Sequence, residues 1–171
     1  LIGEKKEVKI ADIGSGPHSW IGQSLDGVKI EIFASDKNKK FAPLIEYQNM
    51  ERLTYPDNFF DIVHCSNALD HTRDALSAIK EMIRVCKSGG WVYIECWLDQ
   101  LQTGYKHYWD AKEDGVFINK TDKFDLKDFG FKIKFIDDHS ERRYNRIIAT
   151  LQKEYPKKTM DVGEKIKKNL R

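Results

Sequence analysis

The stretch VKIADIGSG at residues 8–16 decides the fold, because an apolar run continues to Asp12 and then breaks into Gly14-Ser15-Gly16. A β-strand that runs directly into a glycine turn is how open α/β sheets build a nucleotide-type pocket. Glycine is needed there because a Cβ would keep the backbone away from a ligand. The Asp12 carboxylate beside the turn disfavours a pyrophosphate and favours a cationic ligand. Taken alone, a Gly-x-Gly pair is equally compatible with a surface turn between two strands.

A second predicted strand, KIEIFAS at residues 29–35, ends on Asp36. This carboxylate follows the glycines by about 20 residues, the spacing at which nucleotide-binding sheets place an acidic residue on the ribose hydroxyls. The alternative is that Asp36 only forms a turn at the end of the strand. The preceding glycine turn favours the ribose role.

A third segment, QNMERLTYPDNFFDIVHCSNALDHT at residues 48–72, carries a longer pattern. It resembles the signature of the class I S-adenosylmethionine-dependent methyltransferases, in particular of the methyltransferase type 11-like group. The matching residues are, in order, Leu53, Tyr55, Pro56, Asp57, Phe60, Asp61, Ile62, Val63, Leu69 and His71. Residues 86–90, CKSGG, are similar to the Leu-Lys-Pro-Gly-Gly connection of that family. Residues 101–171 match no motif that is tied to one substrate.

Strand and helix patterns alternate along the chain, which predicts an α/β fold. The resemblance implies a doubly wound, seven-stranded, mostly parallel Rossmann-like sheet with an antiparallel edge strand. Strands are expected at 8–13, 29–35, 44–47, 61–66, 91–96, 131–136 and 146–151. Apolar residues at helical spacing predict a helix from Arg73 to Cys86, capped by Thr72 or Asp70 and ended by Gly89-Gly90. A short helix is also expected within 18–25, after the glycine turn.

The connection between Asp36 and Asn49 is short for a crossover between parallel strands, which usually needs at least about 10–12 residues besides the strand itself. Two interpretations are open. Either the crossover helix is reduced to an irregular loop, or further residues belong near Lys37–Lys40. The composition of SDKNKKFAP, which has no helical face, favours the second.

Length and composition favour one methyltransferase domain over 1–151, followed by a basic helix or tail over 152–171. The net charge of +2 does not suggest a nucleic-acid partner. The last 21 residues hold seven Lys or Arg and three acids, which is typical of a solvated face, with an anionic partner as the alternative.

The three cysteines, Cys65, Cys86 and Cys96, stand in apolar contexts without metal-binding spacing, and we interpret them as reduced core thiols. No metal site is expected. No signal peptide and no transmembrane segment are recognised, so we expect a cytoplasmic protein. The expected partner is a small-molecule acceptor, and the sequence is also compatible with a homodimer.

The resemblance implies S-adenosylmethionine as the cofactor and assigns roles along three strand ends. The glycine turn would face the methionine part, Asp36 the ribose, and Asn49 and Met50 the adenine. The expected cofactor-binding residues are Asp12, Gly14, Ser15, Gly16, Asp36, Asn49, Met50, Ser66 and Asn67. Pro17 and His18 stand where the family more often has its third glycine.

Methyl transfer requires alignment of the reactants above all, and it needs a base only where the acceptor is a neutral hydroxyl. The candidate catalytic residues are His71 and His107. His71 is also a candidate for a purely structural cap of the next helix. The segment GYKHYWD at 104–110 is the expected acceptor region, so that His18, Tyr105 and Trp109 are expected to bind substrate. The alternative is a loop that packs its aromatic residues back on the sheet.

The leading function is an S-adenosylmethionine-dependent O-methyltransferase acting on a sugar, nucleotide-sugar or phosphorylated precursor of a surface polysaccharide. The alternative is a degenerate methyltransferase fold that binds cofactor or a partner subunit without turnover. A nicotinamide-dependent dehydrogenase is disfavoured, because its third glycine is absent and Asp12 opposes a pyrophosphate.

Overall fold

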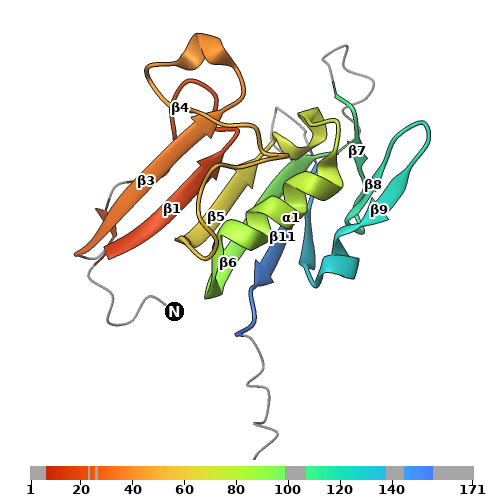
Figure 1. Cartoon of the computed structure of the whole chain (residues 1–171). Coiled ribbons are helices and arrows are strands. Elements are labelled where there is room, and N and C mark those ends of the chain that lie inside the picture. The colour runs from red at the N-terminus through yellow and green to blue at the C-terminus, as the bar shows by residue number, and fades with distance from the viewer. Residues whose placement is uncertain (1–6, 23, 26, 99–106, 138–144, 156–171) are drawn as a thin grey trace, which may run out of the picture.

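The main sheet contains the seven strands that the sequence predicts and one short extra strand (Figure 1). The structure is a computed structural model of the 171-residue chain, and it describes residues 7–22, 24–25, 27–98, 107–137 and 145–155. The strands lie in the order β10-β11-β6-β5-β1-β3-β2, and β4 also pairs with β3. Their bounds are β1 Glu7–Ile13, β2 Ser24–Leu25, β3 Val28–Asp36, β4 Glu46–Tyr47, β5 Phe60–Ser66, β6 Cys86–Trp97, β10 Lys132–Ile136 and β11 Arg146–Gln152.

Strand directions confirm the predicted fold class. Strands β4, β3, β1, β5 and β6 pair in parallel, so that their carboxyl ends meet along one edge of the sheet. Strand β11 runs antiparallel to β6 and forms an antiparallel hairpin with β10. The extra strand β2 pairs antiparallel with β3 at the other end of the sheet. This is the mostly parallel Rossmann-like sheet with antiparallel strands at its edges.

Helix α1, Ala75–Val85, packs its apolar side against the centre of the sheet (Figure 1). Its fully buried Ile79 and Met82 belong to the same core as Val63 of β5 and Val92 of β6. The predicted caps Thr72 and Asp70 are wrong, because the N-cap is Asp74, whose carboxylate accepts the backbone N–H of Ser77 at 2.9 Å.

The predicted end of this helix at Gly89-Gly90 is also wrong. The helix ends at Val85, and both glycines lie inside β6. The backbones of residues 89–90 and Lys153 exchange hydrogen bonds of 2.7 and 2.9 Å. A Cβ on Gly90 would stand 2.7 Å from the carbonyl oxygen of Asp61. These glycines therefore permit a close approach of neighbouring strands rather than stopping a helix.

Two expected helices are replaced by irregular chain. The helix predicted within 18–25 is wrong, because residues 18–22 are helix-free and Ser24–Leu25 form β2. Gly22 interrupts this segment, and glycine is unfavourable inside a helix. Between β3 and β4 the chain makes a 3-10 turn at Lys39–Phe41, so in this sequence the crossover takes the form of an irregular loop.

A small second sheet was not predicted. It contains β7 Asp110–Ala111, β8 Val116–Ile118 and β9 Lys123–Asp125 and is followed by the 3-10 helix Leu126–Phe129. Its buried Phe117 and Phe124 stack at 5.1 Å and join the core that α1 covers. Strands of two or three residues are too short to show an alternating pattern, which is why the sequence did not reveal them.

Much of the family-type signature is structural. Arg84 of α1 donates to the carbonyl oxygens of Tyr55 and Leu53 at 2.9 and 3.0 Å and to the Asp57 carboxylate at 2.6 Å. Asp61 accepts the backbone N–H of Lys9 at 3.0 Å, which ties β5 to β1. Part of the signature therefore consists of residues that attach the segment 53–61 to helix α1 and to strand β1.

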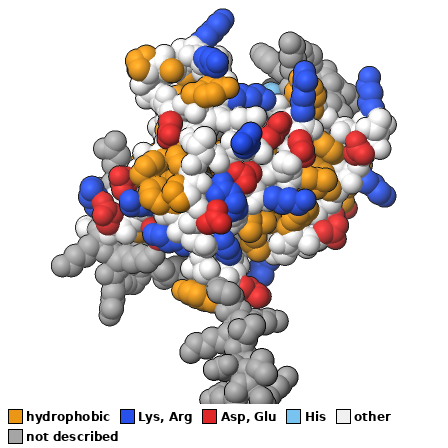
Figure 2. All heavy atoms as spheres, viewed as in Figure 1, with side chains coloured by type: hydrophobic (Ala, Val, Ile, Leu, Met, Phe, Trp, Pro, Cys, Tyr) orange, Lys and Arg blue, Asp and Glu red, His pale blue; other side chains and the backbone are white. Residues whose placement is uncertain are grey.

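Acidic and basic side chains are intermixed over the face of the molecule shown in Figure 2, with hydrophobic patches between them, in keeping with the small net charge. Within the described part of the chain, no helix is long and apolar enough to cross a membrane.

Candidate functional site

The glycine turn after β1 is fixed by β3. The backbone N–H groups of Gly14 and Ser15 both donate to the carbonyl oxygen of Ser35, at 2.8 and 3.0 Å. Gly14 and Gly16 have φ angles of 73° and 70°, which side chains rarely adopt. A Cβ on Gly14 would stand 2.4 Å from the Cβ of Ala68, whereas one on Gly16 would meet nothing within 4 Å. Gly14 is thus required by packing, and Gly16 borders open space.

That open space is a cavity of about 290 Å³ at the carboxyl ends of β1, β3 and β5. Ligands of open α/β sheets bind at this edge. The cavity brings together six predicted site residues from four segments of the chain. They are Gly14, Gly16, Asp36, Met50, Asn67 and His71. Six further lining residues, which the sequence did not single out, are Ile13, Lys37, Asn38, Phe41, Gln48 and Ala68.

Asp36 is held at the cavity by the backbone. One carboxylate oxygen accepts the N–H of Gly16 at 3.2 Å, and the other accepts the N–H of Asn38 at 2.8 Å. Each carboxylate oxygen has a second lone pair, so both can still accept a ligand hydroxyl. Asp36 therefore both holds the glycine turn in place and offers acceptor oxygens to ligand hydroxyls.

Gln48 is a lining residue that the sequence did not reveal. Its side chain is buried, donates to the Glu46 carboxylate at 3.0 Å and to the Thr54 hydroxyl at 2.7 Å, and accepts the backbone N–H of Thr54. Its position directly after β4 was the available signal, because strand ends line such cavities.

Four predicted cofactor residues are not among the residues that line the cavity. The Asp12 carboxylate is buried and lies 2.8 Å from Nδ1 of His64, whose ring stacks on Tyr93. The side chain of Asn49 accepts the backbone N–H of Glu51 at 3.1 Å. The Ser66 hydroxyl accepts from the Asn67 amide at 3.2 Å. Ser15, the fourth such residue, belongs to the turn itself through its backbone.

A cluster of Asp70, His71 and His107 borders the cavity. Nδ1 of His107 lies 2.5 Å from Oδ2 of Asp70, and both side chains are at least nine-tenths buried. The His71 and His107 rings lie 4.2 Å apart between centroids, and His71 lines the cavity. The carbonyl oxygen of Asp70 accepts the backbone N–H groups of Tyr108 and Trp109 at 2.8 and 3.3 Å. The two predicted catalytic histidines are therefore neighbours, and Asp70, which the sequence suggested only as a helix cap, is a further residue of this cluster.

The predicted substrate-binding residues have different outcomes. His18 is exposed and makes an edge contact with Trp20 at 4.5 Å. Trp109 is 4% exposed and packs against Phe124 in the core. This burial favours the alternative of an aromatic residue packed back into the fold over direct contact with a substrate, and the substrate-binding role stays a prediction. Tyr105 lies outside the described residues.

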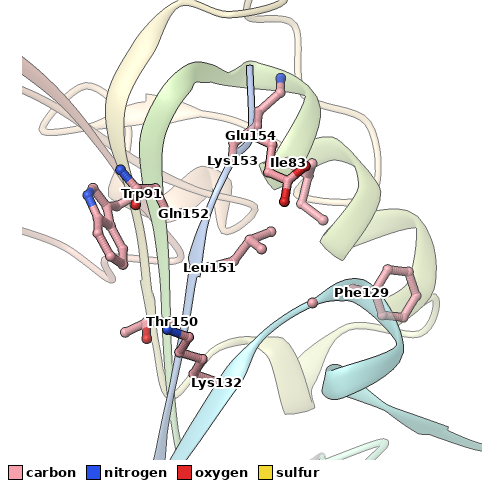
Figure 3. A pocket seen from close by; sticks show the side chains of 10 residues that line it. Ile83, Trp91, Phe129, Lys132, Thr150, Leu151, Gln152, Lys153 and Glu154 are labelled. Carbon is pink, nitrogen blue, oxygen red and sulfur yellow. The ribbon is translucent and has the colours of Figure 1, made fainter. Parts of the chain in front are cut away.

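A second cavity, of about 520 Å³, lies near the start of β6 and the end of β11, at the opposite edge of the sheet (Figure 3). Its labelled side chains include Ile83, Trp91, Phe129 and Leu151. The ammonium group of Lys153 donates to the backbone oxygen of Cys86 at 2.8 Å and to Asn58 at 3.0 Å. This cavity lacks the glycine turn and the strand-end carboxylate, so we place the candidate site at the other edge.

All three cysteines are buried and free, as expected for core thiols. Burial raises the pKa of the Cys65 thiol to about 12 and that of Cys86 to about 11. Such thiols are poor nucleophiles at neutral pH.

The comparisons with known proteins agree with this geometry. Residues 12–94 match the family described as methyltransferase domain. This match, which spans just under half of the chain, shows a likeness to the class I S-adenosylmethionine-dependent methyltransferases. S-adenosylmethionine is accordingly the cofactor of that family.

Two curated relatives and one solved structure illustrate the likeness. The chain is 31% identical over 110 residues to a ubiquinone biosynthesis O-methyltransferase of Nitrosomonas europaea, with 54% of this chain and 45% of the relative covered. It is 33% identical over 90 residues to the ubiquinone/menaquinone biosynthesis C-methyltransferase UbiE of Shewanella sediminis, with 53% and 32% covered. The fold is shared with a crystal structure of a SAM-dependent methyltransferase from Aquifex aeolicus, at a TM-score of 0.58 and 14% identity, covering 87% of this chain and 85% of that one. The chain thus spans less than half the length of these two curated relatives.

The cavity fits the cofactor of this family. Gly16 leaves room for a ligand to approach the backbone, and the buried Met50 supplies a thioether to the cavity wall. Asp36 offers two carboxylate oxygens to paired hydroxyls. These features are compatible with the roles predicted for the glycine turn, Met50 and Asp36 towards the methionine, adenine and ribose parts, and those roles stay predictions.

Proposed function

We propose that this chain transfers a methyl group from S-adenosylmethionine to an oxygen atom of a small-molecule acceptor. The observation that carries the proposal is the cavity at the carboxyl ends of β1, β3 and β5, with Gly16, Asp36 and Met50 in its wall. His71 lines the same cavity, so a polar side chain that can take a proton lies next to the cofactor pocket.

When bound, the cofactor supplies an electrophilic methyl group on a positively charged sulfur. The protein then has to hold an acceptor oxygen in line with that methyl and keep the geometry fixed. Asn67 has a positive φ of 48° directly after β5, and its amide oxygen accepts the backbone N–H of Trp97 at 3.0 Å. This hydrogen bond ties the chain between the cofactor pocket and the histidine cluster to β6.

A neutral hydroxyl acceptor must lose its proton, and we assign this step to His71 and His107. Asp70 would act as a positioning residue, because its carboxylate fixes one nitrogen of the His107 ring. His107 lies against His71, which faces the cavity, so the pair can carry a proton from the acceptor towards Asp70.

The proposal also concerns the chemical class of the methyl acceptor. The interpretation from the sequence is a sugar, nucleotide-sugar or phosphorylated precursor of a surface polysaccharide. The names of the two curated relatives add quinone-ring precursors to the compounds worth testing. The acceptor would enter beside His71, and the protein would act on it within the cytoplasm.

Calorimetry with S-adenosylhomocysteine tests cofactor binding first, and an isotope-transfer assay with both acceptor classes tests turnover. Saturable binding with transfer to an oxygen supports the proposal. Binding without transfer to any acceptor would favour the degenerate alternative, a protein that binds cofactor or a partner subunit without turnover. No binding of S-adenosylhomocysteine to the full chain would refute the proposed site.

A further inference from the structure

The cluster of Asp70, His71 and His107 has the composition of a metal site. One ligand atom from each of the three side chains lies within 4.8 Å of the other two. Two imidazoles and one carboxylate on one side of a site are a recurrent ligand set for divalent transition metals. Asp70 and His71 are adjacent in the chain, whereas His107 is brought in by the backbone hydrogen bonds of the next two residues to Asp70.

Asp70 provides a second, independent observation. Its residue is 4% exposed, and its Oδ1 atom is buried with no hydrogen-bond partner in the structure. Leaving a buried carboxylate oxygen unsatisfied destabilises the folded state, because the oxygen has lost its hydration without gaining a partner. The other oxygen, Oδ2, holds Nδ1 of His107. A cation in contact with Oδ1 would remove this cost.

We infer that Asp70, His71 and His107 bind one divalent transition-metal ion of the Zn²⁺ type next to the cofactor pocket. Imidazole ligands favour Zn²⁺, Co²⁺ or Fe²⁺ over Mg²⁺, which prefers oxygen ligands and keeps several waters. Three protein ligands leave an open coordination position, as in catalytic zinc sites. The expectation from the sequence, which found no metal site among the cysteines, did not consider this set.

The inference rests on the proposed function and specifies how the acceptor loses its proton. His71 belongs both to the cluster and to the cavity wall, so the open position lies beside the place where a methyl acceptor would enter. A hydroxyl oxygen bound there releases its proton more readily, because a divalent cation stabilises the resulting anion. With the metal bound, His71 and His107 would act as ligands in place of the base assigned above. The O–H bond would break, the proton would leave to solvent, and the oxygen would keep the electron pair for attack on the methyl carbon, whose bond to sulfur breaks to release S-adenosylhomocysteine. The acceptor class is therefore a compound that binds metal through a hydroxyl oxygen, such as a phenol, an enol or a vicinal diol.

The test is a titration of the untagged, chelator-treated full chain with Zn²⁺ alone, followed by calorimetry, with Co²⁺ absorption as a spectroscopic readout. We expect saturable binding of one ion per chain. His107→Ala and Asp70→Asn should each weaken Zn²⁺ binding by at least about tenfold, since loss of a ligand has at least the effect of losing an outer partner. Because Asp70 and His107 are buried and their variants could unfold, His71→Gln at the cavity rim is the deciding variant, with the same expected loss.

The matched control is His64→Ala. His64 also pairs with a buried aspartate, Asp12, at 2.8 Å, and it belongs to no group of three ligands among the described residues. Its Zn²⁺ affinity should equal that of the wild type. Absence of saturable Zn²⁺ binding, or equal affinity in His71→Gln and wild type, overturns the inference. S-adenosylhomocysteine titrations on the same samples keep the two proposals separate: failure of Zn²⁺ binding alone rejects the metal site, and failure of cofactor-analogue binding in the wild type rejects the proposed function.

Discussion

The two halves of the candidate site are built in different ways. The cofactor half is made by backbone: a glycine turn tied to Ser35 and a carboxylate, Asp36, held by two N–H groups. The acceptor half is made by side chains, Asp70, His71 and His107, which come from segments 37 residues apart. The first half follows from local sequence and the second from tertiary packing. Substitutions in the cofactor half should therefore change cofactor affinity, and substitutions in or beneath the acceptor half should change turnover or the free energy of unfolding.

The largest expected effect tests whether Trp109 belongs to the acceptor half or to the core beneath it. Trp109→Ala should lower the free energy of unfolding by about 3–5 kcal/mol, because it empties the space of a large buried side chain. Urea unfolding measures this loss, and Trp109→Phe should retain much of the stability because it keeps an aromatic ring against Phe124. A loss of turnover with a change in unfolding free energy below about 1 kcal/mol would instead restore the substrate-binding interpretation.

The next effect tests the cofactor half. Gly16→Val should weaken S-adenosylhomocysteine binding at least about a hundredfold, or about 2.7 kcal/mol, because the side chain would project into the space meant for the ligand. Calorimetry measures the affinity. Gly27→Val is the matched control, since Gly27 has a φ of 79°, also has nothing within 4 Å of its Cβ position, and does not line the cavity. If Gly27→Val loses as much affinity for S-adenosylhomocysteine as Gly16→Val, the loss comes from backbone strain and not from blocking of the cavity.

Asp36→Ala should weaken binding of S-adenosylhomocysteine by about 1–3 kcal/mol through loss of charge-assisted hydrogen bonds to the ribose. The structure adds a complication, because the same carboxylate supports the turn through the N–H of Gly16. An analogue without ribose hydroxyls separates the two roles in a double-mutant cycle. If the variant and the analogue lose affinity additively, Asp36 supports the turn and does not touch the ribose.

Strands, the glycine turn and Asp36 could be predicted because each depends on a few neighbouring residues. The contact of His107 with Asp70 could not be predicted, since it depends on backbone hydrogen bonds that dock Tyr108 and Trp109 on the carbonyl of Asp70. Trp109 shows the same limit: an aromatic residue in a polar segment gives no sign of whether it faces a ligand or the core. The helix expected after the glycine turn failed for another reason, because Gly22 disfavours a helix and residues 24–25 pair with β3 as β2.

Glu51 links the two halves of the site. It directly follows Met50 of the cofactor cavity, and its Oε1 atom accepts the Thr72 hydroxyl at 2.5 Å and the backbone N–H groups of Arg73 and Asp74 at 3.0 and 3.2 Å. These donors follow His71, so one carboxylate holds the acceptor half against the cofactor half. The Thr72 hydrogen bond, with help from the two backbone N–H groups, lowers the pKa of Glu51 below its usual 4.5.

The smallest expected effect tests this link. Glu51→Gln keeps an acceptor oxygen but removes the charge, so the free energy of unfolding should fall by about 1 kcal/mol at neutral pH. Because the folded-state pKa is lowered, the stabilisation by the carboxylate is fully present above pH 4.5 and is lost as the pH falls through the folded-state pKa. The unfolding curves of wild type and variant should therefore converge in acid. Glu113→Gln, at an exposed glutamate, is the control and should change the unfolding free energy by less than about 0.5 kcal/mol. A difference for Glu51→Gln that persists unchanged into acid would show that the amide disturbs the geometry of the link, and that the charge of Glu51 does not hold the two halves together.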